Sequence, residues 1–140
     1  MATFTSQIYE ILNLNGDDVG SSVVNTINNV NYVDNRILSI PSGSVTTLFS
    51  FDSVPGAGTF VTSSVQYVRV TNNSITTPVK LIVSSSTEAM SYLIATGSSY
   101  MMSTSKMTGS ESGLLFDDIR SVKVQPSSSN ASIEYYIATT

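Results

Sequence analysis

The sequence contains no cysteine and no histidine. Without cysteine, the chain has neither a disulfide framework nor a thiolate zinc site. Without histidine it lacks the commonest general base, and the two absences together exclude the Ser-His and Cys-His nucleophile systems. Any hydrolytic chemistry would have to use carboxylates or lysine. We therefore assign no catalytic residue and expect that the chain is not an enzyme.

Charge is also scarce. Charged residues make up 11% of the 140 residues, compared with about 25% in ordinary globular proteins. The net charge is −4 and the six Lys and Arg residues are scattered singly, so there is no basic patch for nucleic acid or for an anionic membrane surface. A polar surface with so few charges is typical of proteins that pack into assemblies, and equally of a plain β-rich domain, because Thr and Val are good strand formers.

Targeting and membrane signals are missing as well. The first residues, MATFTSQIYE, do not contain the basic and apolar regions of a signal peptide. No segment approaches the roughly 18 consecutive apolar residues of a membrane helix. We expect neither a membrane nor a nucleic-acid partner, and a length of 140 residues predicts one domain.

Short segments in which apolar and polar residues alternate recur along the chain, as expected for half-buried strands. In the clearest, 65–70, Val65 and Tyr67 point to one face while Val68 and Val70 point to the other, which predicts a strand covered on parts of both faces. The other predicted strands are 45–52, 79–84, 89–95, 119–125 and 132–138. Gly, Pro, Asn and Ser clusters separate them, and this spacing predicts a sandwich or a barrel.

Two stretches are less regular. The first 35 residues have mixed spacing in 7–14 and in 23–33, and allow either a helical turn around Ile8–Leu12 or an edge strand. Residues 1–20 could be a docking arm that lies against the domain or against a neighbouring subunit. The candidate interface residues are Ile8, Tyr9, Ile11, Leu12 and Tyr136. The second stretch, 103–116, is rich in small and polar residues and predicts a long projecting loop.

The remaining candidates for chemistry are weak. The pairs Asp17-Asp18 and Asp117-Asp118 are adjacent residues, which point to opposite faces in a strand and are typical of turns. The loop 15–18 could offer oxygen ligands to calcium, but it lacks the alternating ligands of an EF-hand. Of Tyr135 and Tyr136, one should face the core and the other should face outward. We assign no metal and no cofactor.

One segment suggests a family. Residues 64–102 contain a strand that ends in Val-Arg-Val-Thr-Asn, Ser- and Thr-rich turns, and the apolar run 79–83. This segment resembles small virion proteins of tailed bacteriophages. The resemblance implies a jelly-roll or related β-sandwich, and a capsid decoration (cement) protein that is a homotrimer and binds the major capsid protein or another virion protein at the capsid surface. Head–tail connector, tail and fibre components have the same composition.

Two other functions stay open. A carbohydrate-binding or adhesin module would use the seven tyrosines as a stacking platform, and it should be a monomer with a concave aromatic face. A carboxylate enzyme is the third alternative. The virion protein should instead be an oligomer that buries some of the candidate interface residues.

Overall fold

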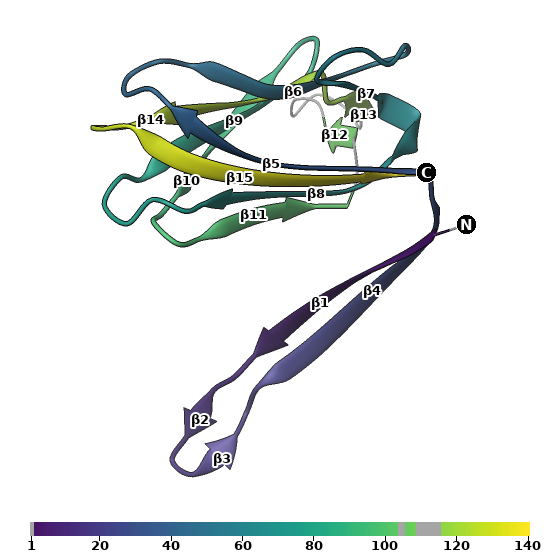
Figure 1. Cartoon of the computed structure of the whole chain (residues 1–140). Helices are drawn as coiled ribbons and strands as arrows, with labels where there is room; N and C mark the ends of the chain where they lie inside the picture. Colours follow the sequence, from purple (N-terminus) through teal and green to yellow (C-terminus); the bar gives the residue numbers. More distant parts are fainter. Residues whose placement is uncertain (1, 104–105, 109–115) are drawn as a thin grey trace.

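The chain folds almost entirely into β-strands, arranged as a two-layer sandwich from which a long hairpin projects (Figure 1). The computed structural model describes residues 2–103, 106–108 and 116–140. The all-β sandwich predicted from the alternating pattern is therefore confirmed. Both chain ends lie at the side of the sandwich from which the hairpin leaves (Figure 1).

The sandwich consists of a four-stranded and a five-stranded sheet. The first has the order β11-β8-β15-β5, and its strands are β5 (Tyr32–Ile40), β8 (Val65–Asn72), β11 (Ser99–Met102) and β15 (Ala131–Thr139). The second has the order β10-β9-β14-β6-β7, and its strands are β6 (Thr46–Asp52), β7 (Thr59–Val61), β9 (Val79–Ser84), β10 (Ala89–Ile94) and β14 (Ser121–Pro126). Neighbouring strands are antiparallel, except that the short edge strand β7 runs parallel to β6.

The connectivity is that of a jelly roll. If the strands of the sandwich other than β7 are numbered 1 to 8 in chain order, the two sheets read 1-8-3-6 and 2-7-4-5. Successive strands thus change sheets, except that strands 4 and 5 (β9 and β10) are neighbours in one sheet, and the chain winds around the core as paired Greek keys. The chain leaves β7 through the short 3-10 turn η1 (Thr62–Ser64) and enters β8.

The core lies between the two sheets. Along β15 the side chains of Ile133, Tyr135 and Ile137 are buried, while Ser132, Glu134 and Tyr136 between them are half-buried, which is the two-residue period of a strand with one face inward. Phe49 of β6 meets Tyr135 edge to face across the core, with ring centroids 5.3 Å apart. Burial of each such side chain contributes roughly 1.5–3 kcal/mol, so this interface between the sheets holds the domain together.

The predicted strands are found close to their expected positions. The strand predicted at 79–84 has those bounds, and β8 is buried on parts of both faces, as expected for 65–70. The strand predicted to begin at Ile119 begins at Ser121, although the Arg120 N–H still donates to the Ser84 carbonyl oxygen. The predicted loop 103–116 lies mostly outside the described residues. Its two sides include the paired strands β12 (Lys106–Thr108) and β13 (Phe116–Asp118).

Candidate functional site: the projecting hairpin

The N-terminal segment is a long antiparallel hairpin. Strand β1 (Ala2–Glu10) pairs with β4 (Ser21–Val30), and the short strands β2 (Asn13–Leu14) and β3 (Asp17–Asp18) extend the ladder to the tip. The helical turn considered around Ile8–Leu12 is replaced by strand β1, so the edge-strand alternative holds. The arm predicted at 1–20 extends to Val30, because β1 needs β4 to satisfy its backbone hydrogen bonds.

The tip is a tight two-residue turn. Asn15 and Gly16 have φ angles of 55° and 95°, the pair of positive values that the commonest hairpin turns require. The Asn13 side chain accepts a hydrogen bond from the Gly16 N–H, and Asp18 accepts one from the Gly20 N–H. The loop considered for calcium is thus a hairpin turn. Within the described residues, no group of three or more His, Cys, Asp or Glu side chains is placed to hold a metal ion.

The base of the hairpin is fixed to the sandwich by a small aromatic cluster. The Phe4 ring lies 4.9 Å from that of Tyr67 and 5.3 Å from that of Tyr136, between ring centroids. Ile27, opposite Phe4 in the register, packs against the same cluster. The register slips between Ala2 and Phe4, and Asn29 on the opposite strand has a φ of 62°. Such a bulge bends a strand, and here it lies where the hairpin departs from the sandwich.

Beyond this base, apolar side chains of the hairpin are exposed. Tyr9 is 69% exposed and Ile11 is 87% exposed. Ile8 pairs with Val23 on the face that carries Phe4, whereas Tyr9 points to the other face. Further exposed apolar residues of the hairpin are Leu12, Leu14, Val19 and Val24. Both faces of this two-stranded ribbon therefore present apolar surface to solvent.

A cleft runs between the hairpin and the outer face of the four-stranded sheet. One part, of about 170 Å³, is lined by Ile8 and Val23 from the hairpin and by Tyr67, Met101 and Met102 from the sandwich. An adjoining hollow of about 420 Å³ is also lined by residues of β1 and of the sheet. The exposed apolar surface of the arm thus continues onto the sandwich.

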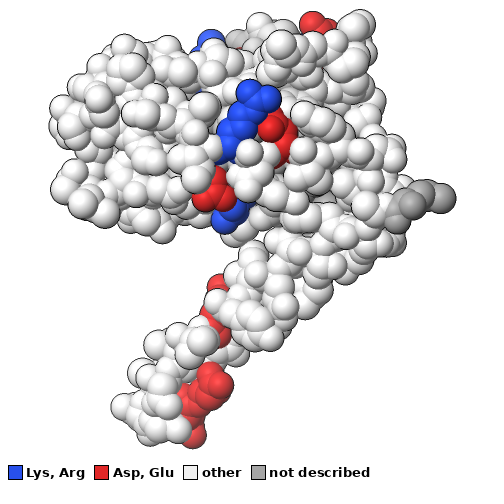
Figure 2. All heavy atoms as spheres, in the orientation of Figure 1, with Lys and Arg blue, Asp and Glu red and all other residues white. Residues whose placement is uncertain are grey.

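The charge of the hairpin has one sign. It carries Glu10, Asp17 and Asp18, and residues 1–30 contain no Lys or Arg. Figure 2 shows acidic side chains along the outer half of the hairpin, whereas basic and acidic side chains lie side by side on the sandwich. One such pair on the sandwich is Arg69 with Glu134. A surface that receives the hairpin tip should therefore be apolar with a neutral or basic rim.

The structure brings together four of the five candidate interface residues. Ile8, Tyr9, Ile11 and Leu12 lie on the exposed part of the hairpin, but Tyr136 lies at its base, half-buried under Phe4. The expectation that Tyr135 and Tyr136 face opposite sides is confirmed, since Tyr135 is in the core. The contribution of β4 to the arm was not predicted from the sequence. The adjacent pair Val23-Val24 was the available signal, and it went unused because β4 was not assigned to the arm.

The carboxylate pair Asp17-Asp18 lies on the hairpin as β3, and Asp118 of the second pair lies in a separate hollow that no hairpin residue lines. Asp118 lines a hollow of about 570 Å³ at the end of the sandwich, with Asp52 and Arg120. The pKa of Asp52 is lowered by hydrogen bonds from the Ser53 N–H and hydroxyl. The side chain of Asp117 lies outside the described residues. The hydrogen bonds from Ser53 thus favour the charged form of Asp52.

Comparisons with known proteins add no relative. A scan against protein-family models, a search of curated proteins and a search of solved structures each found no significant match. In the described part of the chain, no helix has the length and apolar character needed to cross a membrane.

Proposed function

We propose that this chain is a structural virion protein of a tailed phage, which decorates and stabilises the capsid shell and uses the projecting hairpin to attach. The observation that carries the proposal is the exposed apolar surface on both faces of the hairpin. The proposed partner is the major capsid protein or another virion protein, the proposed state is a homotrimer, and the proposed location is the capsid surface.

The outer part of the hairpin needs a partner surface to become stable. A two-stranded ribbon is at best marginally stable in water when no further layer covers it. Among the described residues, it is the base that is covered, through Phe4 and Ile27. Ile11, at 87% exposed, and its apolar neighbours would gain roughly 1.5–3 kcal/mol each if a partner buried them fully. A partner surface would therefore complete the packing that the chain itself leaves open.

Three further features support a role in assembly. The sequence has few charges to desolvate when surfaces associate. The hairpin also has unpaired strand edges, which favour strand addition from a neighbour. The jelly roll occurs in viral capsid proteins, and in lectins as well, so the fold contributes an analogy only. A head–tail connector, tail or fibre component is the alternative within the same class.

The location is tested by immunogold electron microscopy of particles of the phage that encodes the sequence, with antibodies raised against the purified chain. Label over the head shell is the expected result. Label at the neck or tail would overturn decoration in favour of the connector, tail or fibre alternative. Particles without label would overturn the virion assignment.

The oligomeric state is tested by light scattering of the purified protein. The mass should be three times the 14.9 kDa of one chain, and a monomer would overturn the trimer.

The role of the hairpin is tested with a matched pair of variants. Ile11→Ser and Ile75→Ser each remove one isoleucine, 87% and 92% exposed respectively, and Ile75 lies in the loop between β8 and β9. In a co-sedimentation assay with capsid shells that lack the chain, Ile11→Ser should weaken binding roughly ten- to a hundredfold. Ile75→Ser should bind like the unmodified chain. Equal binding by both variants would show that the outer hairpin around Ile11 is not the attachment surface.

A further inference from the structure

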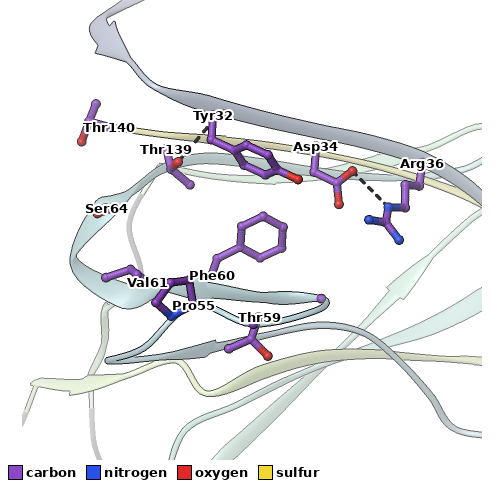
Figure 3. Close-up of a pocket in the computed structure, with 12 residues that line it drawn as sticks. Tyr32, Asp34, Arg36, Pro55, Thr59, Phe60, Val61, Ser64, Thr139 and Thr140 are labelled. Atoms are coloured by element: carbon purple, nitrogen blue, oxygen red, sulfur yellow. Dashed lines mark hydrogen bonds and ion pairs between the residues drawn. The ribbon is translucent and has the colours of Figure 1, made fainter.

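A separate pocket of about 260 Å³ lies on the open side of the sandwich, between the edge strands β5 and β7 of the two sheets. Figure 3 shows Tyr32, Asp34 and Arg36 along one wall, on β5, and Phe60 on the facing wall, on β7. These three β5 residues are at alternate positions, so their side chains share the face that meets the other sheet. The pocket is thus lined by both layers of the jelly roll.

The polar groups of the pocket are held in place by hydrogen bonds. The Asp34 carboxylate accepts one from the Tyr135 hydroxyl at 2.9 Å and one from the Arg36 Nε–H at 3.0 Å, each on a different oxygen. Burial, and then this bond to Asp34, raise the pKa of Tyr135 to about 12. The phenol therefore stays protonated and remains a donor at neutral pH. Asp34 is fixed from two sides, in an orientation that does not depend on a ligand.

Both polar groups keep unused hydrogen-bonding capacity. A carboxylate oxygen can accept more than one hydrogen bond, and a guanidinium has five N–H donors. Only the Nε–H of Arg36 contacts Asp34, and the Arg36 side chain is 55% exposed. The pocket therefore offers an acceptor, Asp34, next to several free donors on Arg36. This combination matches a hydroxyl group, which donates and accepts at once.

The apolar wall is aromatic and partly open. The rings of Tyr32 and Phe60 touch, with centroids 6.0 Å apart. Phe60 is buried, whereas Tyr32 is 53% exposed, so part of the Tyr32 ring surface is free. An exposed aromatic ring beside convergent polar groups is the usual composition of a small-ligand site.

The charge and the size of the pocket limit the class of ligand that it can bind. The opposite charges of Asp34 and Arg36 balance each other, and the chain as a whole carries −4, so nothing in the pocket favours an anion over a neutral molecule. Its volume of about 260 Å³ lies below the roughly 300–1,000 Å³ of sites for drug-sized ligands. We propose that this pocket binds one neutral sugar ring, with its C–H face on Tyr32 and its hydroxyls on Asp34 and Arg36. Asp34 is the only carboxylate side chain among the described lining residues, and glycosidic hydrolysis usually needs two, so the proposal is binding without cleavage.

The test is a titration of the ¹⁵N-labelled full chain with methyl glycosides of glucose, galactose and mannose, with N-acetylglucosamine and with glucuronic acid, followed by amide chemical shifts. We expect at least one neutral sugar to shift the amides of Tyr32, Phe60 and Thr139, with a dissociation constant of about 1–10 mM because a single ring makes few contacts. A response to glucuronic acid alone would overturn the neutral class. No localised shift with any sugar would overturn the site.

Variants separate ring stacking from a general structural effect. Tyr32→Phe keeps the aromatic face and should retain binding, whereas Tyr32→Ala should weaken it roughly three- to tenfold. Arg36→Gln should also weaken it, through the loss of donors. The matched control is Tyr9→Ala on the hairpin, an exposed tyrosine outside this pocket, which should leave the titration unchanged. If Tyr32→Ala binds as well as the unmodified chain while its thermal unfolding is unchanged, the proposed stacking is wrong.

Discussion

The sandwich and the hairpin are both built from antiparallel strands, yet they bury their side chains to very different extents. In β15 the inward-facing side chains are buried from Ala131 to Thr139. In β4, which is about as long, only Val30 at the sandwich end is buried. Both pairings are antiparallel, so the difference comes from the second layer, which among the described residues covers the base of the hairpin alone. Strand pairing fixes the shape of a ribbon, and packing of layers supplies most of its stability.

The largest expected change in stability comes from a substitution in the core of the sandwich, compared with one on the exposed hairpin. Phe49 is buried and contacts Phe51, Phe60 and Tyr135. Phe49→Ala should lower the free energy of unfolding by about 3–5 kcal/mol, because it leaves a cavity between the sheets. Ile11→Ala, on the exposed hairpin, should change it by less than about 0.5 kcal/mol. Urea unfolding followed by circular dichroism measures both. Similar losses in the two variants would mean that the hairpin is packed in solution, against what the isolated chain shows.

The alternating pattern was sufficient to predict six of the nine sandwich strands, because one side of each faces a core made of many other strands, but it did not predict β5, β7 or β11. It could not predict the hairpin, since Ile8 and Tyr9 point to opposite faces and both are exposed, so no periodicity distinguishes one face. Tyr136 was a candidate interface residue and it does point out of the core, but the base of the arm covers it. That cover depends on a contact between residues far apart in the sequence, which a local pattern does not contain.

The pocket between β5 and β7 could not be predicted from a local sequence pattern either. Tyr32, Asp34 and Arg36 follow the strand period, but Phe60 reaches them only because β7 adds to the edge of the other sheet. No spacing along the chain brings these residues together. The connectivity of the jelly roll does so, and it became visible only with the strand order.

A second prediction concerns the pH dependence of stability, which should come from Tyr135 in the core of the sandwich. The pKa of Tyr135 is raised from 10.0 to about 12 in the folded chain, so the folded state holds this proton more tightly than the unfolded state does. The resulting stabilisation should be complete below about pH 10 and should be lost as the pH rises toward 12. Urea unfolding at a series of alkaline pH values measures the loss. Tyr135→Phe should be less stable at neutral pH, by about 1–2 kcal/mol, and should lose less stability on alkalinisation. An identical alkaline loss in this variant would assign the effect to other groups.

A third prediction concerns a substitution that should loosen the hairpin from the sandwich without affecting the sandwich itself. Phe4→Ala removes the ring that contacts Tyr67 and Tyr136, and should weaken the docking of the hairpin by about 1–2 kcal/mol. Hydrogen exchange measured by mass spectrometry should become faster across residues 2–30 and stay unchanged in β9. Tyr9→Ala is the control, because Tyr9 is an exposed residue on the opposite face of β1. Faster exchange throughout the sandwich would show that the arm is part of its folding unit.

The smallest expected effect on stability lies at the outer part of the hairpin. A Cβ atom at Gly20 would lie 2.2 Å from the Glu10 carbonyl oxygen, which is a backbone atom. Gly20→Ala should therefore disturb the pairing of Glu10 with Ser21, while the sandwich changes by less than about 0.5 kcal/mol. Amide and Cα chemical shifts of residues 10–21 report the disturbance, and Ser22→Ala on the same strand is the control.

The Gly20→Ala experiment also tests whether attachment depends on the shape of the outer hairpin. Ile11 and the other apolar residues of the outer hairpin are exposed, yet a glycine at a close backbone approach shapes the ribbon there. If Gly20→Ala disturbs the tip and lowers shell binding while Ile11 is still present, attachment depends on the geometry of the ribbon as well as on its apolar surface. If the tip shifts and binding is unchanged, the contact involves the part of the hairpin nearer the sandwich, around Ile8 and Val23.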